Sequence, residues 1–320
     1  MRHSVFLFSA HKFFLFTEQV FMQLLPPFLK PGDSILMLST ARHISREECQ
    51  PAIAFWESRG FQVIIGKTIG KSHHQYAGTD RERWEDLQYA LDHPDIKAIL
   101  CARGGYGTVR LLEYIDWDAF VRHPKWIVGY SDVTYLLNHV SNYFGIAAIH
   151  ASMPVNYTGN TREALDSLLD TLTGKNVSYP VPPHPLNRPG VATGELTGGN
   201  LSILHNMTGT TSGMLTHGKI LFLEDLDEYL YHIDRMMMNL KRAGKLEGLA
   251  GLIVGGFTQM KDNAIPFGCT AQEIIREHVE SYNYPVCFDF PTGHIADNRA
   301  LIVGRKGKLC VSGRGVTLDF

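Results

Sequence analysis

The sequence has few cysteines, and their spacing does not form a framework. Five occur in 320 residues, an odd number without a C-x-x-C pair: Cys49, Cys101, Cys269, Cys287 and Cys310. Zinc sites and disulfide scaffolds both depend on paired or closely spaced cysteines. We therefore predict neither a metal site nor disulfides, and we interpret these cysteines as small buried hydrophobic residues in a reducing compartment.

The chain also lacks an excess of charge of either sign. Its formal net charge is −2, and charged residues make up 19% of the sequence. Proteins that bind nucleic acids usually carry a basic patch or stripe. The nearest approach to one, Arg299 with Arg305 and Lys306, is diluted by apolar residues. The sequence therefore predicts no nucleic-acid partner.

The start of the chain has no hydrophobic run long enough to cross a bilayer. A basic beginning and the apolar residues 4–8 imitate an export signal, but His11 and Lys12 interrupt the run. No cleavage site with small residues follows. We interpret residues 1–21 as an extension upstream of a natural start at Met22, with a poor export signal as the second hypothesis. On the first interpretation the protein is cytoplasmic and has no membrane partner.

What the sequence does contain, from residue 33 to about 170, is an alternation of short apolar runs and helical patterns. The apolar runs cover residues 34–39, 61–66, 96–101, 126–129 and 146–150. A capping box, Ser45-x-x-Glu48, opens the first helical segment, and others follow at 81–91, 132–143 and 162–172. This alternation predicts an α/β fold with a parallel sheet covered on both faces, flavodoxin-like or Rossmann-like. In such sheets ligands gather at the carboxyl ends of the strands.

Prolines mark the predicted division of the chain into two domains. Five of them lie between residues 176 and 190, where helical or strand periodicity is weak. We predict an N-terminal α/β domain at 22–170, a proline-rich linker at 171–192 and a C-terminal domain at 193–320. The last range is strand-rich, with one clear helix at 231–243 and a hairpin turn at 313–315, which predicts an α+β domain.

The strongest local signal for chemistry is residues 128–132, VGYSD, where a buried strand runs into a helix. A serine at such a join can project from the sheet edge, with the next amide facing the same space. Ser131 is therefore a candidate nucleophile, although Val133 replaces the second glycine of G-x-S-x-G. The alternative is that Ser131 only caps the helix.

A second signal is residues 103–107, RGGYG, directly after the strand that ends at Cys101. Paired glycines allow a close approach of the backbone, and an amide of Gly104 or Gly105 could stabilise an oxyanion together with the amide of Asp132. A phosphate loop fits poorly, because neither of the usual glycine-rich patterns is present. A plain turn remains open as the alternative.

Two further segments could supply an acid and a base. An apolar strand ends in the acidic residues 224–228, and a glycine-bordered loop holds His294. Neutral imidazole suits a general base because it titrates near working pH. Composition alone selects neither one acid of the cluster nor one of the 15 histidines.

Taken together, these segments resemble the LD-carboxypeptidase (muramoyltetrapeptide carboxypeptidase) family of serine peptidases, which includes microcin-immunity hydrolases. Five motifs occur in the family's order: RGGYG at 103–107, GYSD at 129–132, TGGNL at 197–201, LED at 223–225 followed by IDRM at 233–236, and GHxxDN at 293–298. The resemblance covers the chain from about residue 24 to its end.

The resemblance implies a catalytic triad of Ser131 as nucleophile, His294 as base and Glu224 as the acid that orients His294. It also implies an oxyanion hole from Asp132 and Gly104 or Gly105, hydrolysis before the terminal D-alanine of a muropeptide tetrapeptide in peptidoglycan recycling, no cofactor, and a homodimer. A carboxypeptidase must bind a free carboxylate, for which Arg103 and Arg299 are candidates. Asn200 is a further candidate for substrate binding.

Three other functions stay open at this stage. Relatives on the same scaffold hydrolyse peptidyl-nucleotide amides, which would favour an aromatic shelf beside Ser131; the proline-rich segment offers only Tyr179. A non-catalytic binding protein is less favoured, because all three triad positions are filled. A thiol nucleophile at Cys101 would require an exposed sulfur near a histidine.

Overall fold

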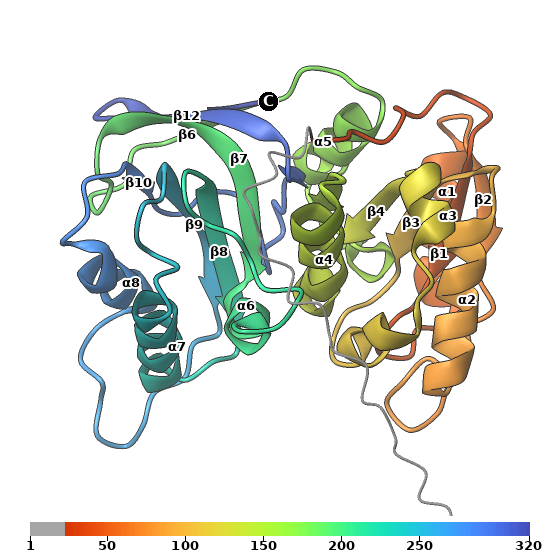
Figure 1. Ribbon diagram of the computed structural model, residues 1–320, viewed down its shortest axis with the longest axis horizontal. Helices are drawn as coiled ribbons and strands as arrows, with labels where there is room; N and C mark the ends of the chain where they lie inside the picture. The colour runs from red at the N-terminus through yellow and green to blue at the C-terminus, as the bar shows by residue number, and fades with distance from the viewer. Residues whose placement is uncertain (1–22) are drawn as a thin grey trace, which may run out of the picture.

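The computed structural model describes residues 23–320. The predicted extension at 1–21 and the predicted start at Met22 lie outside the described residues. Figure 1 shows two lobes, each built on a β-sheet, with helix α4 between the sheets. Within the described range, no helix combines the length and apolar character needed to cross a membrane.

The first lobe contains a six-stranded sheet in the order β11-β5-β4-β3-β1-β2. All neighbours are parallel except β11, which runs antiparallel to β5. The strands are β1 (Ser34–Leu38), β2 (Gln62–Ile65), β3 (Ile96–Cys101), β4 (Trp126–Gly129), β5 (Ala148–His150) and β11 (Leu301–Val303). The parallel sheet that the alternating pattern predicts is confirmed for β1 to β5, and residues 301–303, which lie in the predicted C-terminal domain, add one antiparallel edge strand to it.

Helices cover both faces of this sheet because successive side chains of a strand point to opposite faces. Leu36 and Leu38 of β1 enter one hydrophobic cluster, and Ile35 and Met37 enter another. The first cluster includes residues of α2 and α4, and the second includes residues of α1 and α5. The helices are α1 (Arg46–Glu57), α2 (Asp80–Asp92), α3 (Asp118–Arg122), α4 (Thr134–Phe144) and α5 (Arg162–Leu172).

The second lobe contains a seven-stranded mixed sheet in the order β10-β9-β8-β7-β12-β13-β6. Strands β10 to β7 are parallel, and β7, β12, β13 and β6 are antiparallel. The strands are β6 (Ser178–Val181), β7 (Gly190–Asn200), β8 (Ile220–Leu226), β9 (Gly251–Thr258), β10 (Val286–Cys287), β12 (Lys306–Ser312) and β13 (Gly315–Asp319). Three helices accompany it: α6 (Leu201–Met207), α7 (Leu230–Arg242) and α8 (Ala271–Val279).

The proline-rich segment does more than connect the lobes. Its residues 178–181 form β6, an edge strand in which Pro180 lies opposite Thr317 of β13. Proline cannot donate to a ladder, and an edge strand tolerates this because one side has no partner strand. The predicted proline-rich linker at 171–192 therefore includes an edge strand of the second sheet.

Two helices of the second lobe were not predicted. Helix α8 begins at a capping box of Thr270 and Glu273, the same signal that was recognised at Ser45 and Glu48. Helix α6 has only seven residues and starts at Asn200, directly after a strand. Its shortness leaves too few turns for a periodic pattern to show in the sequence.

Candidate active site

Ser131 lies in a strained turn at the carboxyl end of β4. A short 3₁₀ helix, Ser131–Val133, connects β4 to α4, and Ser131 has φ +60°, a left-handed conformation that is costly for a non-glycine residue. A Cβ at Gly129 would lie 2.8 Å from Cγ1 of Val133, so glycine is required where Val133 packs. No side-chain cap bond is made at either helix start, so Ser131 does not act as a cap.

The glycine loop after β3 lies directly against this serine. A Cβ at Gly104 would be 3.0 Å from both Cβ and Oγ of Ser131, whereas a Cβ at Gly105 would meet the side chain of Arg42. Gly104 is buried and Gly105 is exposed. The carboxylate of Asp132 accepts a hydrogen bond from the Thr108 amide at 2.8 Å, which ties the glycine loop to the turn. Of the two glycines, Gly104 is therefore the one beside the hydroxyl.

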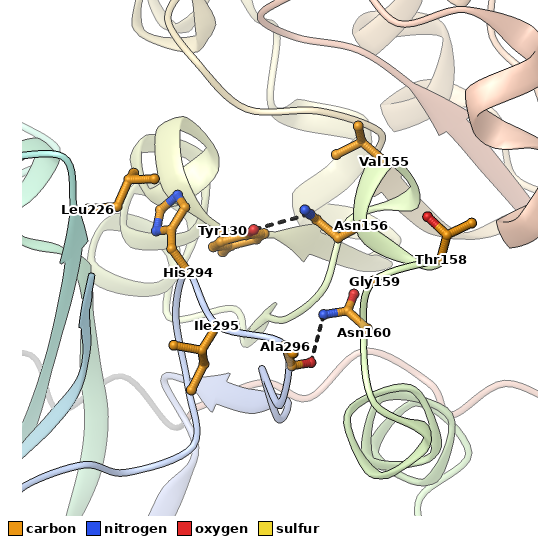
Figure 2. Close-up of a pocket in the computed structure, with 10 residues that line it drawn as sticks. All are labelled: Tyr130, Val155, Asn156, Thr158, Gly159, Asn160, Leu226, His294, Ile295 and Ala296. Carbon is orange, nitrogen blue, oxygen red and sulfur yellow. Dashed lines mark hydrogen bonds between the residues drawn. The ribbon is translucent and has the colours of Figure 1, made fainter. Parts of the chain in front are cut away.

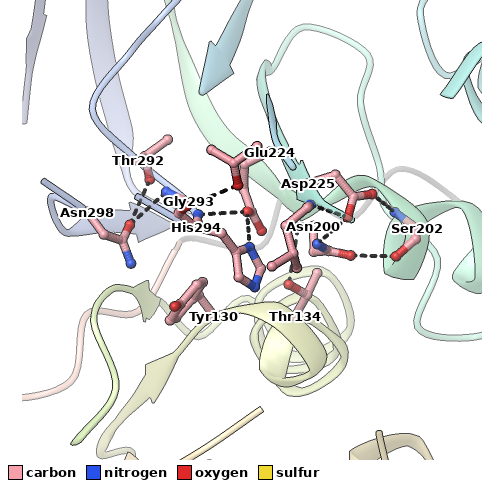
Figure 3. Close-up of polar contacts among 12 residues, drawn as sticks. Tyr130, Thr134, Asn200, Ser202, Glu224, Asp225, Thr292, Gly293, His294 and Asn298 are labelled. Atoms are coloured by element: carbon pink, nitrogen blue, oxygen red, sulfur yellow. Dashed lines mark hydrogen bonds and ion pairs between the residues drawn. The ribbon is translucent and has the colours of Figure 1, made fainter. Parts of the chain in front are cut away.

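His294 and Glu224 form a buried acid–base pair (Figure 3). Nδ1 of His294 lies 2.6 Å from Oε2 of Glu224, and the His294 amide donates to the same oxygen at 3.2 Å. Glu224 lies in β8 and is fully buried, while the His294 side chain is 13% exposed. Since the carboxylate accepts, Nδ1 carries the proton and Nε2 of neutral His294 is left free to act as a base.

The electrostatics of this pair favour a negatively charged Glu224 and a positively charged His294. Burial opposes the ionisation of Glu224, but His294 outweighs it by charge and by hydrogen bonding, and the pKa of Glu224 is lowered. Burial likewise opposes the protonation of His294, yet the neighbouring carboxylate raises its pKa. Glu224 thus stabilises the imidazolium that forms when His294 accepts a proton.

The loop that carries His294 is shaped by its own motif. Gly293 has φ +103°, and a Cβ there would lie 2.5 Å from Cβ of Glu224, so only glycine allows this approach. The side chain of Asn298 accepts from the Gly293 amide at 2.8 Å and closes the loop. Thr161, which caps α5, donates its hydroxyl to Asp297 at 3.1 Å and anchors the loop to the first lobe.

A pocket of about 380 Å³ opens beside His294 (Figure 2). The ring of Tyr130 lies at its base with its centroid 4.7 Å from that of His294, and its hydroxyl donates to Asn156 at 3.1 Å. Other lining residues are Thr158, Asn160, Leu226 and Ile295. Residue-type patterns gave no signal for this pocket, because its lining comes from separate loops of both lobes.

Tyr130 directly precedes Ser131, so the nucleophile candidate and the His294–Glu224 pair are brought to one place. No hydrogen bond joins the Ser131 hydroxyl to His294 within residues 23–320. In enzymes without substrate, catalytic hydrogen bonds are often long and tighten only when the substrate binds. The arrangement can perform acyl transfer if His294 approaches Ser131 in the complex.

The three residues predicted to bind substrate all have partners inside the protein. Arg103 donates to the His43 carbonyl at 3.1 Å and pairs with Glu48 at 3.4 Å. Arg299 makes a two-pronged pair with Asp297, with Nε 3.1 Å from Oδ1 and Nη2 3.0 Å from Oδ2. Their role in substrate binding stays a prediction.

Asn200 has a structural position at the start of α6. Its side chain accepts from the Ile203 amide, as a helix cap does, and donates to the buried carboxylate of Asp225 at 2.9 Å. Asn200 is 3% exposed. A substrate contact by Asn200 likewise stays a prediction.

Cys101 and Tyr179 do not have the settings that the alternative functions require. Cys101 is fully buried at the end of β3, and burial raises the pKa of its thiol to about 12. The thiolate, which is the nucleophilic form, is therefore scarce at neutral pH. Tyr179 is buried in β6 with its hydroxyl bonded to the Ala300 carbonyl, so it forms no open shelf.

Comparison with known proteins identifies the family. Residues 35–151 match the LD-carboxypeptidase N-terminal domain, and residues 193–309 match the LD-carboxypeptidase C-terminal domain. A probable murein peptide carboxypeptidase of Bacillus subtilis is 33% identical over 296 residues, which cover 89% of this chain and 91% of the relative. The chain belongs to the LD-carboxypeptidase family.

Two further comparisons show the breadth of this family. The structure of muramoyltetrapeptide carboxypeptidase from Oxalobacter formigenes superimposes with a TM-score of 0.81 at 28% identity, over 89% of this chain and 98% of that one. The microcin C7 self-immunity protein of Escherichia coli is 25% identical over 318 residues, covering 87% of this chain and 90% of that protein. The LD-carboxypeptidase family thus includes carboxypeptidases and microcin-immunity proteins of the same fold.

Proposed function

We propose that this member of the LD-carboxypeptidase family is a serine carboxypeptidase that releases terminal D-alanine from muropeptide tetrapeptides. The observation that carries the proposal is the hydrogen bond, 2.6 Å long, between Nδ1 of His294 and Oε2 of buried Glu224, with the His294 ring against Tyr130, the residue before Ser131. The names of two relatives also support it: a probable murein peptide carboxypeptidase at 33% identity and a muramoyltetrapeptide carboxypeptidase at 28% identity.

In this mechanism Ser131 is the nucleophile. Its Oγ attacks the scissile carbonyl carbon while Nε2 of His294 takes the hydroxyl proton. Glu224 holds the imidazole in the correct tautomer and stabilises its charge. The peptide C–N bond then breaks, His294 gives the proton to the leaving amine, and free D-alanine departs. His294 then takes a proton from water, and the resulting hydroxide attacks the acyl carbon. The ester bond to Oγ of Ser131 breaks, His294 returns the proton to Oγ, and the shortened peptide leaves.

Backbone amides stabilise the charge that develops on the carbonyl oxygen. The proposed donors are the Asp132 amide and an amide of the glycine loop, and the position of Gly104 against Ser131 Oγ favours that part of the loop. Preorganised donors of this kind contribute a large share of the rate enhancement, because they need no reorganisation during the reaction.

The test is release of free D-alanine from L-Ala-D-Glu-meso-diaminopimelate-D-Ala by the wild type and by Ser131→Ala. Loss of the nucleophile is expected to lower kcat by about 10⁴- to 10⁶-fold. Ser58→Ala, at an exposed serine after α1, is the matched control and is expected to retain wild-type activity. Circular dichroism of the three proteins establishes that each is folded.

The same assay separates the other hypotheses. Equal release by the wild type and Ser131→Ala would contradict the assignment of the nucleophile. If the wild type instead cleaves a peptidyl-nucleotide amide and releases no D-alanine, the microcin-immunity activity replaces the carboxypeptidase. Turnover of neither substrate would favour a non-catalytic binding protein. Location in the cytoplasm and assembly as a homodimer stay predictions from the sequence.

A further inference from the structure

A carboxypeptidase needs a positive group for a substrate carboxylate, and the pocket beside His294 does not supply one. Its lining contains neutral polar side chains, among them Asn156, Thr158 and Asn160, but neither arginine nor lysine. A carboxylate buried against such groups alone would lose most of its hydration without a compensating charge. The positive partner must therefore come from outside this pocket.

The two arginines that the sequence singled out are both engaged elsewhere. Arg299 has both prongs on Asp297, and Arg103 reaches the His43 carbonyl and Glu48. For either to bind a substrate, an internal ion pair would have to break first.

Arg42 differs from both in its placement. Its backbone amide donates to the Gly104 carbonyl at 3.3 Å, which fixes it to the glycine loop. Its side chain lies across Gly105, where a Cβ would be only 2.1 Å from Cδ and 2.3 Å from Cγ of Arg42. The guanidinium carbon is two bonds beyond Cδ. Arg42 therefore lies along the loop whose other glycine touches Ser131.

The guanidinium of Arg42 is also available. Arg42 is exposed, and within residues 23–320 no ion pair, side-chain hydrogen bond or aromatic ring engages its guanidinium. The close packing over Gly105 holds the aliphatic stem in place, so less conformational freedom is lost when the head group binds a ligand.

We propose that Arg42 binds a carboxylate of the peptide substrate on the Gly104–Gly105 side of Ser131 and so determines substrate specificity. The inference rests on the proposed peptidase function and adds a residue to it. A guanidinium presents two parallel N–H donors to a carboxylate, which a lysine or a neutral side chain cannot reproduce. A tetrapeptide offers this group at three places: D-glutamate, the diaminopimelate side chain and the terminal D-alanine.

The test compares the wild type, Arg42→Met and Arg42→Lys on the free tetrapeptide and on three peptides, each with one of these carboxylates converted to an amide. Arg42→Met is expected to lower kcat/KM on the free peptide by roughly 10- to 100-fold, mainly through KM. Arg42→Lys is expected to recover only part of this loss. The loss by Arg42→Met should disappear on the one amide that lacks the group bound by Arg42, which identifies that group.

Arg314→Met, which removes an exposed arginine at the β12–β13 turn, is the matched control and should behave as the wild type. An unchanged kcat/KM for Arg42→Met, or an equal loss on all four peptides, would overturn the proposal. If the wild type releases no D-alanine, the proposed function fails separately. Calorimetric titration of the tetrapeptide into Ser131→Ala, with and without Arg42→Met, then decides: an affinity unchanged by Arg42→Met overturns the role of Arg42.

Discussion

At the scale of single residues, the surroundings decide which of several identical side chains can do chemistry. Glu224 and Glu228 lie in the same acidic segment, and each contacts a histidine at 2.6 Å, His294 and His232 respectively. Glu224 is fully buried, whereas 23% of the Glu228 side chain is exposed. Water screens the Glu228–His232 pair more strongly than the buried Glu224–His294 pair. The charge of Glu228 therefore has less influence on His232 than the charge of Glu224 has on His294. The two pairs therefore allow a buried and a partly exposed Glu–His contact to be compared within one chain.

Glu224→Gln keeps a side chain of the same size but removes its charge. We expect kcat to fall by about 10²- to 10⁴-fold, because the imidazolium of His294 loses its stabilising partner. Glu224 raises the pKa of His294, and only neutral His294 can accept a proton. Without this charge the pKa falls, so the low-pH limb of the kcat/KM profile should move to lower pH.

Glu228→Gln is the control for this prediction and should leave both kcat and the pH profile unchanged. The measurement is D-alanine release as a function of pH for the three proteins. A low-pH limb that stays in place in Glu224→Gln would contradict the assignment of Glu224 as the partner that sets the pKa of the base.

At the scale of secondary-structure elements, glycines in β7 allow strands and helices to approach closely. Gly198 has φ +137°, and a Cβ there would lie 2.0 Å from the carbonyl oxygen of Phe222 in β8. Gly199 has φ +138°, and a Cβ there would lie 2.7 Å from Thr134 at the start of α4. Since β8 carries Glu224 and α4 follows Ser131, these glycines set the spacing between the two halves of the site.

Gly198→Ala is expected to lower the free energy of unfolding more than a glycine-to-alanine substitution at a positive-φ position with open space around it. The new methyl group meets backbone, which cannot rotate away, so overpacking of about 1–3 kcal/mol adds to the conformational cost of about 1–2 kcal/mol. Gly209→Ala is the control, because Gly209 also has a positive φ, +85°, but open space around it. Urea unfolding of both variants measures the difference. Equal losses of unfolding free energy would contradict the close-approach interpretation.

The sequence predicted elements well where a local signal was complete. The capping box at Ser45 and Glu48, the strand over 96–101 and the hairpin turn between Ser312 and Gly315 are all present. Strand β7 was missed, because its sequence GVATGELTGGN is rich in glycine and poor in the β-branched and aromatic residues typical of strands. Tertiary contacts with β8 and β12 on its two sides stabilise it instead.

At the scale of the whole molecule, the two lobes share a hydrophobic core. Leu136 and Val140 of α4 belong to the same buried cluster as Phe222 of β8 and Ile253 of β9. In addition, β11 from the C-terminal part of the chain pairs with β5 and completes the first sheet. The lobes therefore depend on each other for burial of apolar surface, and the active-site candidates lie where they meet.

A fragment of residues 23–175 is accordingly expected not to unfold cooperatively. It lacks β11 and exposes the face of α4 that packs against β7 and α6, and burial of apolar surface is the main stabilising contribution in a domain of this size. All four tryptophans, Trp56, Trp84, Trp117 and Trp126, lie within the fragment. Tryptophan fluorescence in urea therefore reports on this lobe both in the fragment and in the full chain. A cooperative transition of the fragment with the midpoint of the full chain would contradict the shared core.

The sequence by itself determined the alternation of strands and helices, the family, and the position of Ser131 at a strand–helix join. These features depend on local signals, namely apolar periodicity, capping and motif order. The family resemblance implied that Glu224 orients His294, and the tertiary structure brings these two residues, 70 positions apart, into contact. Only the tertiary structure decided that Arg103 is paired with Glu48, whereas Arg42 has no ion-pair partner among residues 23–320. Residues of the same type are indistinguishable in sequence. Their charge, burial and partners are set by contacts between distant segments, and those contacts exist only once the two lobes have packed together.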